Sequence, residues 1–334
     1  MIMHPAVIAL FVGSILVSCM VLYSMRYGIA IQRHWNLQSG SERQLDLEKK
    51  TYLISTIMSY AFAFQLFSLF LFIFTADKLN TLFTGAMCAA GTLNVNGYGY
   101  PTLVLKIINF VFGGTWLVMN YADNKAFDYP LIRRKYLLLI VIAPFVIAEA
   151  IMQGAFFFNL KPHVITSCCG SLFSTEGSGI QGGLAALPGL PMMLAFYLAM
   201  GMTMFSGLYF LMRRGKGGYF FALISIFTFV VSVAALISFI SLYFYELPTH
   251  RCPFCILQRE YYYIGYALYI TLLVGVVGGT GVGILMPYHK FKSLQTIVPS
   301  IKKRLTMMSM ASYLLFTFIV TSVMIFTDFK LHGY

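Results

Sequence analysis

The sequence predicts an all-α integral membrane protein, a polytopic bundle of about eight transmembrane helices. Of its 334 residues, 59% are hydrophobic and only 10% are charged, whereas a soluble domain carries about 25% charged residues. The apolar residues form eight stretches, each long enough to cross the roughly 30 Å hydrocarbon core of a bilayer as a helix. Because each stretch is apolar on all faces, as helices in contact with lipid are, a soluble fold is excluded.

The expected helices follow one another along the whole chain. The first has no basic residue before Arg26, so we interpret it as a membrane span rather than a cleaved leader. Cys19 lies inside it and is interpreted as a packing residue. The eight helices are expected at residues 5–25, 51–75, 102–121, 136–158, 191–212, 218–245, 261–286 and 305–327.

The distribution of lysine and arginine predicts the orientation. Of the 23 basic residues, 17 lie in one set of alternate loops and five in the other. Because cytoplasmic loops carry the excess of basic residues, both termini are expected on the outer side. The same explanation covers the net charge of +12, so we expect lipid and not nucleic acid as the partner of the basic residues.

Two ionisable residues fall inside expected helices. Lys106 lies near the outer end of the third helix, where its amine is expected to snorkel toward the interface. Glu149 lies near the middle of the fourth, with Gln153 one turn further on. A carboxyl group at that depth indicates either a proton or ligand path or a neutral, hydrogen-bonded group, and the sequence leaves both interpretations open.

Five of the six cysteines fall in the loops predicted to face outward. The loops at 76–101 and 159–190 are rich in glycine and proline, which favours tight turns that cap the bundle. We expect a five-helix half, residues 1–215, and a three-helix half, residues 216–334. The first half carries Cys88, Cys168 and Cys169, and the second carries Cys252 and Cys255.

The most informative motif is Cys252-Pro-Phe-Cys255. A Cys-x-x-Cys pair serves dithiol–disulfide exchange, metal binding or haem attachment. Haem attachment needs a histidine directly after the second cysteine, and position 256 is isoleucine. Because the loop is predicted to face an oxidising compartment, a redox-active pair is favoured over two structural thiols.

The motif continues Ile-Leu-Gln-Arg259 between two apolar helices. Over about residues 218–286 this arrangement resembles the membrane disulfide oxidoreductases of the DsbB and BdbC family. The resemblance implies a bacterial inner membrane protein that moves electrons between a periplasmic thiol-disulfide protein and a quinone (ubiquinone or menaquinone). It implies that Cys255 faces the quinone, that Cys252 is its exposed partner, and that Arg259 is a quinone-site residue. Tyr262, in the run Tyr261-Tyr-Tyr263, either walls that site or belongs to the interfacial aromatic belt.

Elementary chemistry favours the same roles. The thiolate is the reactive form of cysteine, and a nearby cation or the start of a helix lowers a thiol's pKa. If Cys255 begins the next helix, Arg259 stands one turn along on the same face. Arg259 as a head-group anchor is the alternative.

A second cysteine pair must come from the first half, because no cysteine follows Cys255. We expect Cys88 to pair with Cys168 or Cys169, since adjacent cysteines form only a strained, labile bond with each other. That pair is either a structural staple or, with the remaining thiol, part of a relay by mixed disulfide.

Two other functions remain open. His163 and His250 precede the outer cysteines, and together these side chains form a candidate site for a soft metal such as Cu(I) or Zn. The chain would then handle copper or another soft metal. A non-catalytic membrane subunit of a redox complex is the second alternative.

Overall fold

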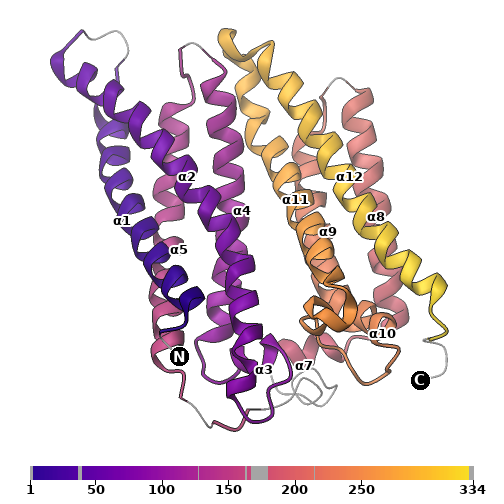
Figure 1. Ribbon diagram of the computed structural model, residues 1–334. Helices are drawn as coiled ribbons and strands as arrows, with labels where there is room; N and C mark the ends of the chain where they lie inside the picture. The colour runs from indigo at the N-terminus through magenta and orange to yellow at the C-terminus, as the bar shows by residue number, and fades with distance from the viewer. Residues whose placement is uncertain are drawn as a thin grey trace. The chain divides into compact units, whose positions relative to one another are not determined.

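The structure, a computed structural model, describes residues 3–36, 40–126, 128–161, 164–166, 180–213 and 215–330. Over these residues the fold is helical, apart from an isolated β-bridge between Thr84 and Ile165. Within the part of the chain that the structure describes, eight helices are long and apolar enough to cross a membrane (Figure 1). The predicted class, an all-α polytopic bundle, is therefore confirmed.

Each span overlaps one of the predicted stretches, and several extend past the apolar run. The second reaches back into a charged segment because glutamate, lysine and glutamine are good helix formers. The outward orientation of both termini stays a prediction from the charge pattern. The spans are Pro5–His34, Gln44–Leu82, Gly99–Asn124, Ile132–Phe158, Gly189–Met212, Gly218–Tyr245, Ile264–Tyr288 and Ile297–Phe326.

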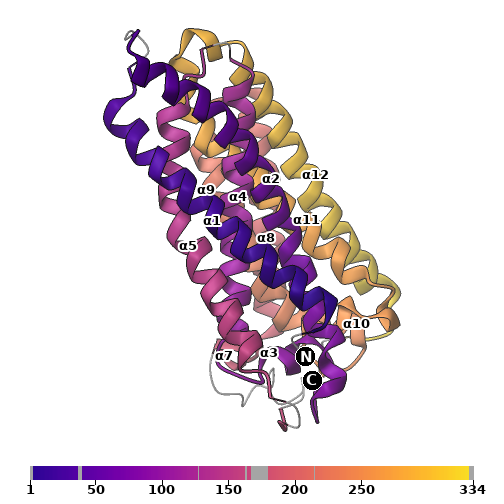
Figure 2. The same cartoon turned by 60° about the vertical axis from the view of Figure 1, so that its left-hand side comes forward.

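The chain divides into two compact units. The first contains residues 1–75, 96–160 and 287–301. Its helices are α1 (Pro5–His34), most of α2 (Glu42–Lys78), α4 (Gly99–Asn124) and α5 (Ile132–Phe158). Helix α5 packs against both α1 and α4, and α1 and α5 run side by side in both views (Figures 1 and 2). Phe62, Trp116 and Tyr136 are fully buried in the core of this unit.

The second unit contains residues 76–95, 161–286 and 302–334. Its long helices are α8 (Gly189–Met212), α9 (Gly218–Ala235), α11 (Ile264–Leu285) and most of α12 (Ile297–Phe326). Helix α9 packs against α8 and α11. Gly279 of α11 lets α9 approach so closely that a Cβ atom there would lie 2.1 Å from Ser225 Oγ. Small residues commonly permit such contact between membrane helices.

This division differs from the two predicted halves, 1–215 and 216–334. Helix α8 belongs with α9 because the two form a hairpin, and Gly215 and Gly217, both with positive φ, make the turn between them. Residues 76–95, which carry Cys88, also belong to the second unit. Cys88, Cys252 and Cys255, the described cysteines of the loops predicted to face outward, therefore lie in one unit.

The span that leads to the Cys-x-x-Cys motif is not uniform. Helix α9 continues into a fully buried π-helical segment, Leu236–Ile240, and then into α10 (Ser241–Tyr245). Glu246 ends it in a left-handed conformation with φ of 54°. Segments of π-helix occur frequently at functional sites, and this one lies just before the motif.

Candidate functional site

The Cys252-Pro-Phe-Cys255 segment is buried. Cys252 is 0% and Cys255 6% exposed. Two tyrosine hydroxyls hold the backbone: Tyr245 donates to the carbonyl of Cys252 and accepts from the N–H of Ile256 at 2.9 Å, and Tyr269 donates to the carbonyl of Pro253. The resemblance implied an exposed Cys252, and this expectation is wrong because the segment around Cys88 covers that thiol.

Cys88 lies directly against this segment. It is 0% exposed and immediately precedes the short helix α3 (Ala89–Leu93), every residue of which is buried. Its Sγ is 3.5 Å from Cys252 Sγ. The sulfur atoms of Cys88, Cys252 and Cys255 all lie within 4.8 Å of one another. We call these three residues the thiol cluster.

Residues 76–95, which we call the Cys88 segment, are fastened to the motif by a small polar network. The Gln258 amide donates to Asp77 Oδ1 at 3.0 Å and to the carbonyl of Met87 at 2.9 Å. Asp77 Oδ1 also accepts from the N–H of Ala89 at 3.2 Å. Gln258 was noted in the sequence only as part of the Gln-Arg pair, and Asp77 was missed. The available signal was a carboxylate at the end of an apolar span, in a chain with only 11 acidic residues.

The Cys88 segment is anchored on its other side by Thr166. The Thr166 hydroxyl donates to the carbonyl of Gly91 at 3.0 Å, and its N–H donates to the carbonyl of Thr84 at 3.0 Å. Gly85 has φ of +89°, and a Cβ there would lie 2.5 Å from Thr166 O. The tight, glycine-dependent turn expected in this loop is therefore present at Gly85.

His250 and Arg251 precede the motif and are partly buried. The His250 ring packs edge-on against Tyr245 with centroids 4.5 Å apart. Burial lowers the pKa of this imidazole below its ordinary value, and the nearby Cys88 opposes the shift. The Arg251 guanidinium donates to the carbonyl of Ala185 in α7 (Ile180–Ala185). His250, predicted as an alternative metal ligand, is not among the three side chains whose ligand atoms converge.

The segment after the motif differs from the expectation. The next transmembrane helix begins at Ile264, not at Cys255 or 261. Extended backbone at Gln258 separates two single 3-10 turns, and Tyr262 and Tyr263 have φ of 53° and 57°. Arg259 therefore does not stand one helical turn beyond Cys255, and α11 cannot supply a helix dipole to that thiol.

Both predicted quinone-site residues lie on the surface. Arg259 is exposed, at the start of the turn Arg259–Tyr261, and Tyr262 is 92% exposed. His163, Cys168 and Cys169 fall outside the described residues, so the expected bond between Cys88 and one of those cysteines stays a prediction. Cys19 is exposed on α1, and the expectation that it packs inside the bundle is wrong.

The first unit holds a separate buried ion pair at membrane depth. Lys106 Nζ lies 2.7 Å from Glu149 Oε1 and donates to Ser68 Oγ at 2.7 Å. Glu149 Oε2 accepts from Asn109 at 2.6 Å and from the Gln65 amide. Lys106 is 1% exposed, so the expectation that it snorkels is wrong: its amine pairs with Glu149. Neither interpretation of Glu149 included an ion pair with Lys106; its hydrogen bonds are of the kind that the second one expected.

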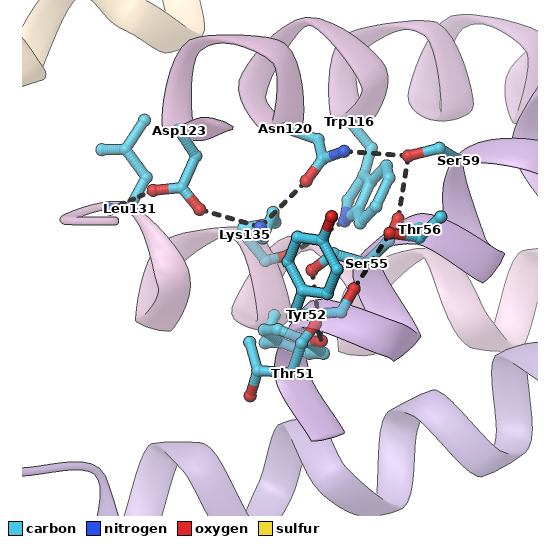
Figure 3. Close-up of polar contacts among 11 residues, drawn as sticks. Thr51, Tyr52, Ser55, Thr56, Ser59, Trp116, Asn120, Asp123, Leu131 and Lys135 are labelled. Carbon is cyan, nitrogen blue, oxygen red and sulfur yellow. Dashed lines mark hydrogen bonds and ion pairs between the residues drawn. The ribbon is translucent and has the colours of Figure 1, made fainter. Parts of the chain in front are cut away.

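A second buried pair joins the same two helices. Lys135 Nζ lies 2.8 Å from Asp123 Oδ2 and 2.9 Å from Asn120 Oδ1. Asn120 in turn donates to Ser59 Oγ at 2.8 Å, and Figure 3 shows this row of side chains crossing from α5 to α4 and α2. Lys135 also lines a pocket of about 320 Å³, with Trp35 and Glu48 among its other walls.

The fold and these contacts define a multi-pass α-helical membrane protein with a buried three-cysteine cluster. No family model matches the sequence, no curated protein matches it, and no solved structure matches it.

Proposed function

We propose that the protein is a membrane thiol-disulfide oxidoreductase that passes electrons between periplasmic thiols and a membrane quinone. One observation carries the proposal: Cys88, Cys252 and Cys255 are buried together, with Cys88 Sγ 3.5 Å from Cys252 Sγ. A Cys-x-x-Cys pair with a third thiol in contact is the minimal set for exchange by intramolecular disulfide transfer. Burial shields it from small soluble thiols.

The exchange is balanced in electrons and protons. A Cys252–Cys255 disulfide is attacked at Cys252 by the Cys88 thiolate, which forms a Cys88–Cys252 bond and releases the Cys255 thiolate. The approach requires the two sulfur atoms, now 3.5 Å apart, to close by about 1.5 Å to the bonding distance. A donor dithiol then reduces the new disulfide and becomes a disulfide itself. Two electrons and two protons then pass from the cluster to the quinone, which leaves as quinol, and the Cys252–Cys255 disulfide forms again.

The route by which a donor reaches the cluster follows from its burial. Cys252 is fully covered, so a periplasmic protein can exchange with it only if the Cys88 segment moves. The hydrogen bonds from Gln258 to Met87 and Asp77 hold that segment against the motif. We propose that opening this contact admits the donor.

The quinone is proposed to bind beside Arg259 and Tyr262. Both side chains are exposed directly after the motif, where a lipid-dissolved ring has access to them. Arginine donates hydrogen bonds to a carbonyl oxygen and stabilises the negative charge that develops on reduction. Ubiquinone or menaquinone, in a bacterial inner membrane, is the expected acceptor.

The test measures quinone reduction by purified protein in vesicles, with a reduced dithiol as the donor. Cys255→Ser and Cys252→Ser are expected to lower the rate to background, and Arg259→Ala to weaken quinone use without unfolding the protein. Cys19→Ser is the matched control, because this thiol lies on the exposed face of α1 in the other unit. If the Cys255→Ser protein reduces quinone as fast as the parent, the proposal is wrong.

A further inference from the structure

We infer that the thiol cluster, when reduced, binds one Cu(I) ion through the sulfur atoms of Cys88, Cys252 and Cys255. This property goes beyond the redox proposal, which requires the three thiols but no metal. It follows from the spacing of the sulfur atoms, from the number of ligands that converge, and from their burial.

The spacing fits a metal–thiolate centre. A metal–sulfur bond of roughly 2.3 Å places three sulfur atoms about 4.0 Å apart in a trigonal plane and about 3.8 Å apart on a tetrahedron. The cluster has one separation of 3.5 Å, and the others are no longer than 4.8 Å. Each separation therefore needs to change by less than about 1 Å to accommodate an ion at the centre.

The number of ligands selects the metal. Among the described residues, no histidine or carboxylate has its ligand atom within this group; His250 packs on the Tyr245 ring and Asp77 bonds to Gln258 and Ala89. Zinc in structural sites takes four ligands. Soft thiolates favour Cu(I), which is stable with three or fewer ligands, so three buried sulfur atoms fit Cu(I) better.

The surroundings preorganise the three ligands. Tyr245 and Tyr269 fix the backbone that carries Cys252 and Cys255, while Gln258 and Asp77 fix the segment that carries Cys88. Groups that orient ligands from outside contribute strongly to metal affinity. The ion would therefore enter a site whose backbone is already held in place.

Binding has a consequence for the proposed redox chemistry. Cu(I) bonded to all three sulfur atoms leaves none of them available to attack or to form a disulfide. No electron is transferred on binding, so the effect is reversible when the ion is removed. Cu(I) is thus expected to hold the cluster in its reduced state and to stop quinone reduction.

The experiment uses full-length protein, reduced with a phosphine under anaerobic conditions in quinone-free detergent. Cu(I) is titrated in competition with bicinchoninate, and about one ion per chain is expected to be retained. X-ray absorption at the copper edge is expected to show three sulfur neighbours at roughly 2.3 Å. This spectrum comes from the parent protein, so it does not depend on whether a variant folds.

Variants locate the site. Since losing even a group that only orients a ligand costs about 10- to 100-fold in affinity, Cys88→Ser is expected to weaken retention by at least about 100-fold. Cys19→Ser is expected to bind as the parent does. Absence of retained Cu(I), unchanged retention by Cys88→Ser, or preferential retention of Zn(II) would each overturn the inference. Failure of quinone reduction with intact Cu(I) binding would instead reject only the redox proposal.

Discussion

The buried Lys106–Glu149 pair gives a prediction whose size follows from its geometry. The two charged atoms are 2.7 Å apart, and both side chains are almost wholly buried. At that distance their attraction is about 6 kcal/mol with an effective dielectric constant of 20. Lys106→Met keeps the length of the side chain but leaves Glu149 without its counter-charge. We expect a loss of about 3–5 kcal/mol in the free energy of unfolding.

The double variant Lys106→Met/Glu149→Leu separates the charge from the packing. It removes both charges, and replacing a whole buried pair by apolar residues is often neutral. We therefore expect the double variant to be more stable than Lys106→Met alone. The control is Lys50→Met, because Lys50 and Asp46 are also 2.7 Å apart but exposed. Losing this pair should not measurably change the free energy of unfolding.

The assay is reversible unfolding in mixed micelles of increasing sodium dodecyl sulfate content, followed by circular dichroism. The single and double variants are compared at the same detergent composition. If Lys106→Met is as stable as the parent, or if the double variant loses as much as the single one, then the pair does not hold α4 and α5 together by charge. Glu149 would then be better explained as part of a proton or ligand path.

Two further variants address the thiol cluster. Gln258→Ala removes the two hydrogen bonds by which the Gln258 side chain holds the Cys88 segment. A membrane-impermeant maleimide should therefore label Cys252 several-fold faster than in the parent. An unchanged labelling rate would show that this contact is not the barrier to access. Gly265→Ala places a Cβ 2.9 Å from the Ile256 carbonyl and should displace the motif, lowering quinone reduction and Cu(I) retention together. Gly201→Ala, where nothing lies within 4 Å, should leave both unchanged, and equal behaviour of the two glycine variants would contradict the packing argument.

The eight spans were predictable because a bilayer imposes a length and a composition that the sequence displays directly. The irregular backbone between Cys255 and Ile264, which delays the start of α11, was not predictable. It depends on left-handed backbone at Tyr262 and Tyr263, and tyrosine gives no local signal for that conformation, unlike glycine. The helix was therefore expected to start too early.

Contacts between distant segments were harder still. Cys88 and Cys252 are separated by 164 positions, and only the packing of the loop residues around them decides that they meet. The sequence showed where the thiols were but not which loops touch, so the contact between Cys88 and Cys252 could not be predicted from it. Lys106 was misread for a related reason: a lysine near the end of an apolar run ordinarily snorkels, and its partner Glu149 lies 43 positions away.

The two buried ion pairs between α4 and α5 constrain how this hairpin can evolve. Helix α4 supplies the base at Lys106 and the acid at Asp123, while α5 supplies the acid at Glu149 and the base at Lys135. A one-turn slide of either helix would separate all four charges from their partners inside the protein, so the pairs fix the alignment of the hairpin. Substitution at any one of these positions leaves a buried charge without its counter-charge. In homologues of this protein we therefore expect the two members of a pair to change together or not at all.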